Sequence, residues 1–130
     1  MHQSTSIDFL IRIKNGYRAG RQQITTPASN FCLNLAKLIK KYGFLQDINL
    51  TEKDGKKQIV LTLKYNDGQP AVSEVKLFST PGRRLYSNYK SLPWGKSQQS
   101  LIIVSTSSGV MSQKEAVAKN LGGELIAEIY

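Results

Sequence analysis

The segment Leu101–Tyr130 constrains the fold of this chain most, because its pattern changes several times within a short stretch. It opens with the apolar run Leu101–Val104, which is typical of a strand that is covered on both faces. Ser112 and Glu115 then form an S-x-x-E capping box, which predicts the start of a short helix. We expect Gly122-Gly123 to end that helix.

The same segment closes with a second strand. Leu125, Ala127 and Ile129 alternate with Glu124 and Glu128, which is the period of an extended chain. The segment therefore predicts strand, hydroxyl-rich turn, helix and strand in close succession.

Composition adds a constraint on partners. The chain has 130 residues and is 40% hydrophobic, enough to bury the core of one compact domain or of two small ones. It carries 18 Lys+Arg against 9 Asp+Glu, a formal net charge of +9, and its pI is near 9.8. This charge is typical of proteins that bind polyanions, although ordinary soluble proteins can also be basic.

Several classes of chemistry are excluded by residue counts. Cys32 is the single cysteine, so neither an intrachain disulfide nor a cysteine cluster for zinc can form. His2 is the single histidine, which argues against a Ser-His-Asp triad or a histidine-rich metal site. We therefore expect no metal and no cofactor. No apolar run approaches the roughly 20 residues of a membrane span, and no signal peptide is evident, so we expect an intracellular or already processed protein.

The N-terminal half predicts two helices. Thr5 is the candidate N-cap of the first, and Asn15-Gly16 is its predicted stop, followed by a loosely structured basic segment over 17–21 and a short strand over 22–26. Ser29 is the candidate N-cap of the second, which Gly43 ends. The apolar stripe of that helix comprises Phe31, Leu35, Leu38, Ile39 and Tyr42.

A hairpin completes this half. Strands over 44–52 and 57–65 flank a turn at 53–56, and Ile59, Leu61 and Leu63 show strand alternation. Cys32 lies beside the helical stripe, where a small buried residue is a better interpretation than a reactive thiol.

The predicted fold class is α+β with two small domains. Residues 1–65 form an N-terminal α-β-α-β-β unit, 66–70 a linker, and 71–130 a mainly β unit with a short helix. A strand over 72–78 and a turn at 80–82 open the second unit. The position of Trp94, buried at a junction or exposed, is left open.

The turn Ser105–Gly109 offers hydroxyls and backbone amides without a catalytic partner. Ser and Thr hydroxyls can bond phosphate, a ribose 2′-OH or base edges, and Gly109 permits a sharp turn. They can equally well cap local backbone groups. No G-x-x-x-x-G-K-[ST] phosphate loop is present.

Basic residues supply two further candidate contacts. Arg83 and Arg84 carry guanidinium groups that can bind phosphate, and Tyr86 has a ring that can stack on a base. An ordinary exposed strand is an alternative. A second basic cluster, which a solvated face would also explain, comprises Arg12, Lys14, Arg18 and Arg21. Glu124 can accept hydrogen bonds from base amino groups or stabilise a turn.

Several blocks of the sequence resemble a known protein family. VSTSSGVMSQKEA followed by LGGELIAEIY resembles the C-terminal signature of the small-subunit ribosomal protein eight family, of bacterial type. Upstream blocks resemble the family in the same order: DFLIRIKNG, TTPAS with YGFL, LTLKY, and STPGRRLY with SLP. The resemblance covers nearly the whole chain.

The resemblance implies a structural RNA-binding protein and not an enzyme. It implies binding to an irregular helix in the central domain of small-subunit ribosomal RNA, a role in subunit assembly, and neighbouring small-subunit proteins as partners. It implies neither a membrane partner nor a homo-oligomer. The alternative is a translational repressor that binds a similar structure in its own operon mRNA. The expected location is a ribosome in the cytoplasm, or alternatively in a mitochondrion or plastid.

Site residues follow by position from the same resemblance. Ser105, Thr106, Ser107 and Gly109 match the RNA-contacting turn. Contacts also implied or suggested are Tyr86, Glu124, Arg83, Arg84, Lys14, Pro27 and Ser29. Two positions depart from the family pattern, since Ser108 and Asn30 stand where lysine is common. An enzyme using the serine turn is the weakest hypothesis, because no general base accompanies it.

Overall fold

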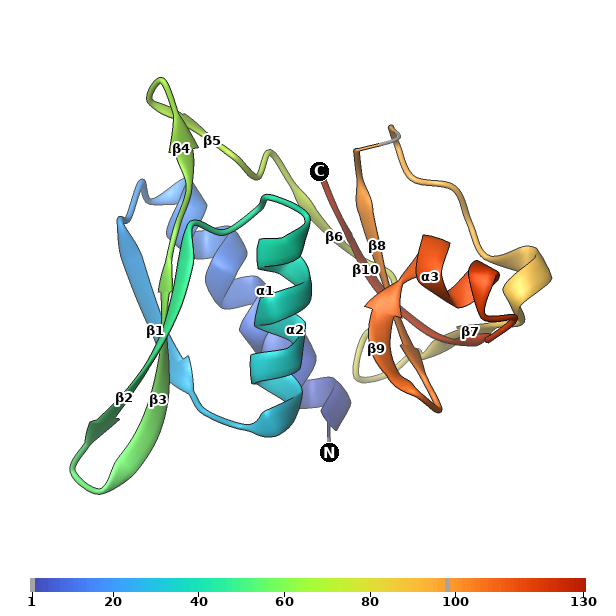
Figure 1. Cartoon of the computed structure of the whole chain (residues 1–130), viewed down its shortest axis with the longest axis horizontal. Coiled ribbons are helices and arrows are strands. Elements are labelled where there is room, and N and C mark those ends of the chain that lie inside the picture. The colour runs from blue at the N-terminus through green and yellow to red at the C-terminus, as the bar shows by residue number, and fades with distance from the viewer. Residues whose placement is uncertain (1, 98) are drawn as a thin grey trace.

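The first half of the chain packs two helices against a small antiparallel sheet. The computed structural model describes residues 2–97 and 99–130. The elements of this half are α1 (His2–Arg18), β1 (Gln23–Pro27), α2 (Asn30–Lys41), β2 (Asp47–Lys53) and β3 (Lys56–Thr62). The strand order β1-β3-β2 makes β1 an edge strand. Figure 1 shows both helices on the side of this sheet that faces the rest of the molecule.

The second half is built around one long strand. The short paired strands β4 (Tyr65–Asn66) and β5 (Gln69–Pro70) connect the first half to the second. The larger sheet has the order β6-β10-β8-β9, and β7 also pairs with β10. Its elements, with the 3₁₀ turn η1, are β6 (Val75–Leu77), β7 (Leu85–Ser87), η1 (Tyr89–Ser91), β8 (Leu101–Thr106), β9 (Gly109–Ser112), α3 (Gln113–Ala118) and β10 (Gly123–Ile129).

The predicted α+β class is confirmed, and so is the α-β-α-β-β order of the first half. Residues 66–70, predicted as a linker, hold the turn of the β4–β5 hairpin, so the domain boundaries stay a prediction. One buried cluster joins Leu35 and Leu61 of the first half to Ile103 and Ile129 of the second. A second cluster lies under α3 and includes Val104 and Leu125. The large sheet is therefore covered on both faces, as the apolar run Leu101–Val104 predicts.

Both predicted ends of the first helix were wrong. α1 begins at His2, before the expected cap Thr5, because a capping preference of about 1 kcal/mol does not stop a helix from extending further upstream. It also continues past Asn15-Gly16 to Arg18. Tyr17 supplies the reason: it is buried, and its hydroxyl donates to the Phe44 carbonyl and accepts from the Lys64 N–H at 3.0 Å.

Gly16 serves packing and not termination. A Cβ at Gly16 would come within 2.7 Å of the Ile24 Cγ2 atom, so the glycine lets α1 approach β1 closely. Gly20, with φ +67°, turns the chain after the helix. Residues 17–21 are therefore the last turn of α1 and a tight connection, and not a loose segment.

The second helix forms as predicted, and the hairpin forms with shorter strands. The Ser29 hydroxyl accepts from the Cys32 N–H at 3.1 Å, which confirms the N-cap. Gly43 has φ +85°, and Phe44 N–H donates to the Ile39 carbonyl at 3.1 Å, which closes the helix end. Cys32 is buried, as expected of a structural residue.

The hairpin turn is two residues long. Asp54 and Gly55 have φ of 54° and 76°, the left-handed pair that suits the twist of a hairpin. Both strands are shorter than predicted: β2 starts at Asp47 and β3 ends at Thr62. Likewise β6 covers only Val75–Leu77 of the strand predicted over 72–78.

Candidate nucleic-acid interface

The serine-rich turn is the tip of the β8–β9 hairpin. Thr106 pairs with Gly109, which leaves Ser107 and Ser108 as the exposed loop. The Thr106 hydroxyl donates to the Gly109 carbonyl at 2.8 Å and accepts from the Ser108 N–H at 3.1 Å. Gly109 takes φ +110°, the sharp turn expected of it. Thr106 therefore holds the loop in shape, whereas Ser107 is exposed at its tip.

The structure brings three predicted site residues into one row across three strands. Glu124 of β10 is the direct cross-strand partner of Tyr86 in β7 and of Ser105 in β8. Direct partners in antiparallel strands share a face of the sheet, so all three side chains lie on the same face. Tyr86 is 66% exposed, whereas Glu124 is only 4% exposed. The row thus presents an accessible aromatic ring beside a buried carboxylate.

The two glycines before Glu124 allow this row to form. A Cβ at Gly123 would collide with the Ser105 carbonyl oxygen, and one at Gly122 would collide with the Ser87 carbonyl oxygen. These contacts show that β10 runs unusually close to β7 and β8 at this point. No side chain larger than hydrogen can replace either glycine without moving the backbone.

The glycines do not end α3, which corrects the prediction made from sequence. The helix stops at Ala118, and Asn120 adopts the left-handed conformation with φ +58°. Asn120 N–H donates to Val117 at 3.1 Å and Leu121 N–H to Ala116 at 2.8 Å, the paired bonds of a Schellman motif. The beginning of α3 is as predicted, since the Ser112 hydroxyl accepts from the Glu115 N–H at 3.2 Å.

Arg83 and Arg84 lie in an exposed loop next to Tyr86. Thr80 and Arg83 exchange backbone hydrogen bonds at 2.8 and 3.1 Å, which confirms the turn predicted at 80–82. Sequence reasoning missed Ser79, a buried residue that fixes this loop. Its hydroxyl donates to the Leu125 carbonyl and accepts from the Leu85 N–H at 3.0 Å. A lone serine in a polar stretch carries no signal of such a role.

The predicted N-terminal contacts lie elsewhere. Pro27 ends β1 and Ser29 caps α2, so both sit at the N-terminal end of α2. In Figure 1 this end of α2 and the tip of the β8–β9 hairpin lie along the same lower side of the molecule. Lys14 is different, because its ammonium pairs with the Glu74 carboxylate at 3.1 Å. The hydrogen bond from Lys14 and that from the Val75 N–H lower the pKa of Glu74.

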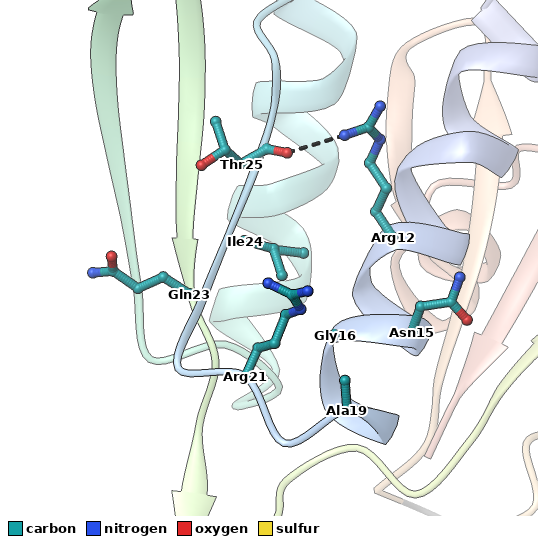
Figure 2. Close-up of a pocket in the computed structure, with 8 residues that line it drawn as sticks. All are labelled: Arg12, Asn15, Gly16, Ala19, Arg21, Gln23, Ile24 and Thr25. Atoms are coloured by element: carbon teal, nitrogen blue, oxygen red, sulfur yellow. Dashed lines mark hydrogen bonds between the residues drawn. The ribbon is translucent and has the colours of Figure 1, made fainter.

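The second basic cluster divides into two groups. Lys14 and Arg18 approach Glu74, at 3.1 and 3.9 Å. Arg12 and Arg21 instead line a groove between α1 and β1, drawn in Figure 2. Basic residues that are close in sequence thus lie on two different surfaces around α1.

Trp94 is exposed, with 82% of its surface accessible. Its loop is tied to β10, because the Lys96 N–H donates to the buried carboxylate of Glu128. In the part of the chain that the structure describes, no helix is long and apolar enough to span a membrane. The described residues also contain no cluster of His, Cys, Asp or Glu suited to a metal ion.

The fold defines a basic α+β protein, and its candidate contact residues give an exposed surface with hydroxyls, guanidinium groups and an aromatic ring. The family model for ribosomal protein S8 matches residues 5–130. The chain belongs to this family, whose members are structural proteins of the ribosome and not enzymes.

Individual relatives agree with the family match. The chain is 40% identical to a small ribosomal subunit protein uS8 of Acidiphilium cryptum, with 95% of each chain covered. It is 38% identical to the uS8 protein of Hyphomonas neptunium and 36% to that of Borreliella afzelii, in both cases over 95% of this chain and 94% of the relative. All three relatives are bacterial proteins.

Proposed function

We propose that this protein is a structural constituent of the small ribosomal subunit that binds directly to an irregular helix in the central domain of small-subunit ribosomal RNA. Family membership supports the ribosomal role. The RNA contact is supported chiefly by the row Tyr86–Glu124–Ser105 beside the hairpin tip. The expected partners are that RNA and neighbouring small-subunit proteins, in a ribosome of the cytoplasm or of an organelle with bacterial ancestry.

The chemistry of this surface suits irregular RNA better than a regular duplex. The deep major groove of an RNA helix is closed to side chains, whereas unstacked bases and 2′-hydroxyls are accessible. Tyr86 offers a stacking plane, the Ser107 hydroxyl can donate and accept, and Arg83 and Arg84 can pair with phosphates. A carboxylate in a basic protein can accept hydrogen bonds from base amino groups, which is the role proposed for Glu124.

A binding measurement tests the proposal. The purified protein is titrated against a transcript of the central domain of small-subunit ribosomal RNA and against a regular duplex of equal length. We expect tight binding to the first only, with an affinity that falls steeply as salt rises, because phosphate contacts release counterions. Equal affinity for both RNAs would contradict shape-specific recognition.

The alternative role, repression of translation through a similar structure in messenger RNA, would use the same surface. Sedimentation of the native protein separates the two. Co-migration with small subunits is expected for a ribosomal constituent. A protein found only with messenger RNA would favour the regulatory role.

A further inference from the structure

Strand β2 is an open edge of the three-stranded sheet. It pairs with β3 over Asp47–Lys53, and in the part of the chain that the structure describes no strand lies along its outer side. The opposite edge, β1, is blocked, because Arg12 donates to the Thr25 carbonyl at 3.1 Å and Pro27 has no N–H. Figure 1 shows the β2–β3 hairpin extending away from the second half of the molecule. An open strand edge is a template for pairing with another chain.

The hairpin turn determines which backbone groups of β2 point outward. Asp54-Gly55 is a two-residue turn, so the pair that flanks it is hydrogen-bonded, and bonded and non-bonded pairs alternate from there. Ile48, Leu50 and Glu52 therefore direct their N–H and C=O groups away from β3. The Ile48 N–H agrees with this direction, since it donates to the Asp47 carboxylate at 2.9 Å. No described residue bonds the outward groups of Leu50 and Glu52, so they can pair with an added strand.

A groove runs along this edge, between β2 and α2. It is a cavity of about 370 Å³ lined by Leu33, Lys37, Lys40, Ile48, Asn49 and Leu50. The side chains of Ile48 and Leu50 lie on the sheet face that packs against the helices, because their partners in β3, Leu61 and Ile59, are buried in the core. Leu50 is nevertheless 61% exposed. The groove thus offers a place for an apolar side chain next to open backbone groups.

The charges around the groove favour an acidic ligand. Lys37 is exposed, and among the described residues it has no ion-pair partner. Lys40 pairs with Asp47 at 3.4 Å, and Glu52 stands directly opposite Lys57 in β3. Lys37 therefore leaves the α2 wall of the groove positively charged.

These features fit an extended peptide better than RNA. A strand that adds to a sheet edge forms main-chain hydrogen bonds, and pockets beside the edge take its alternate side chains. Side chains two positions apart share a face, so an apolar residue beside Leu50 places the second next residue beside Ile48, in the groove that Lys37 lines. The phosphate groups of RNA could not donate to the open carbonyls, and RNA would gain nothing from the exposed leucine.

We propose that the β2 edge binds an extended segment of a neighbouring small-subunit protein, which adds to the sheet as a further strand and carries an acidic residue two positions from an apolar one. The proposal rests on the proposed function, which brings partner proteins close to this chain. The apolar side chain would lie between Leu33 and Leu50, and the acidic one would pair with Lys37.

Titration of the purified protein with a synthetic peptide tests the edge directly. In the probe, glutamate and valine stand two positions apart and threonine fills the other positions; the control peptide has lysine in place of glutamate. With the probe, we expect the amide signals of Leu50 and Glu52 to shift in NMR spectra and to become protected from hydrogen exchange. The Kd of the control peptide should be about three- to ten-fold higher, because an attractive charge pair becomes a repulsive one. No shift at these amides, or equal affinity for both peptides, would overturn the proposal.

Two variants on opposite faces of β2 serve as a matched pair. Leu50→Ser removes the apolar side chain from the groove, whereas Thr51→Ser changes the next residue, whose side chain lies on the other face. Both positions are exposed, so both variants should fold like the wild type. We expect Leu50→Ser to raise the Kd of the probe peptide about three- to ten-fold, as the loss of an apolar anchor does, and Thr51→Ser to leave it unchanged. An equal effect of the two variants would contradict binding in the groove.

Crosslinking in assembled small subunits identifies the occupant. A photoreactive benzoylphenylalanine replaces Leu50 in one sample and Thr51 in the other, and mass spectrometry identifies the crosslinked segments. We expect position 50 to capture a protein segment with the acidic and apolar spacing described above, and position 51 to capture much less of it. Crosslinks from position 50 to RNA or to a second copy of this chain, or no crosslink, would refute the proposal. Absence of the wild-type protein from small subunits would instead refute the proposed function itself.

Discussion

At the scale of single residues, the candidate interface depends on side chains with two distinct tasks. The hydroxyls of Thr106 and Ser79 form internal hydrogen bonds that fix two loops. Ser107 is exposed at the hairpin tip, and Tyr86, in the same row as Ser105, is 66% exposed. Hydroxyl side chains of the same chemical type thus divide into those that fix a loop and those that are exposed for contact.

Replacing Ser107 with alanine should weaken RNA binding without affecting folding. A lost hydrogen bond in a buried contact costs about 1–3 kcal/mol, so the Kd should rise accordingly. A filter-binding titration with the central-domain transcript measures this change. Ser91→Ala, also an exposed serine, is the control and should bind like the wild type. An unchanged Kd for Ser107→Ala would exclude its hydroxyl from the contact.

Gly123→Ala should be strongly destabilising, because its Cβ would collide with the Ser105 carbonyl oxygen in the centre of the sheet. Overpacking of this kind costs roughly 1–3 kcal/mol or more. The free energy of unfolding, measured with urea, reports it. Gly82→Ala is the matched control, since a Cβ there meets no atom within 4 Å and the residue does not have a positive φ. Equal stability of the two variants would contradict the close approach of β10 to β8.

At the scale of elements, two helices end with the same kind of cap, a residue in the left-handed conformation, but the residue differs. α2 uses Gly43 at φ +85°, and the short α3 uses Asn120 at φ +58°. Both place the next residue's N–H on a carbonyl of the last turn. Asparagine tolerates the left-handed region better than other non-glycine residues, so α3 can stop before the glycines that β10 needs.

Asn120 therefore offers a test of the α3 terminus. Asn120→Ala should lower the free energy of unfolding by about 1 kcal/mol, because a Cβ without a compensating polar group disfavours positive φ. Asn120→Gly should leave stability equal or higher. Thermal and urea unfolding of the pair measure the difference. A more stable alanine variant would show that the left-handed cap does not govern this helix end.

At the scale of the whole molecule, polar contacts join the two halves across the shared hydrophobic cluster. The Tyr42 hydroxyl contacts the Ser112 hydroxyl at 2.7 Å, and Lys41 pairs with Glu115 at 3.4 Å. Lys14 pairs with Glu74 at 3.1 Å, beside the closing residue Tyr130, whose N–H donates to the Glu74 carbonyl at 3.2 Å. These contacts fix how α1 and α2 sit on the large sheet.

The Glu74 pair predicts a dependence of stability on pH. The hydrogen bond from Lys14 lowers the pKa of Glu74 from its ordinary value of 4.5, so the ionised carboxylate stabilises the fold. This contribution is present above the ordinary pKa and is lost as the pH falls through the lowered one. The Tm of the wild type should therefore exceed that of Glu74→Gln at pH 7, and the gap should close in acid. A gap that persists to pH 2 would contradict the assignment.

What the sequence determined by itself was local. Capping boxes, alternation and turn pairs depend on neighbouring residues, so Ser29, Ser112 and the Asp54-Gly55 hairpin could be predicted. The motifs in their order also indicated the family and the hydroxyl-rich turn. Helix stops were less certain, because glycine has several uses that look alike in a sequence.

Only the tertiary structure decided which of these uses applied. Gly16 and Gly122-Gly123 resemble helix stops in the sequence. In the structure, Gly16 makes room for the Ile24 side chain, and Gly122-Gly123 make room for the backbone of Ser87 and Ser105. Pairing across three strands also placed Tyr86, Glu124 and Ser105 in one row, and packing sent Lys14 and Arg12 to different surfaces. Such contacts join residues far apart in the chain, and their energies depend on the register and packing that form only when the chain folds.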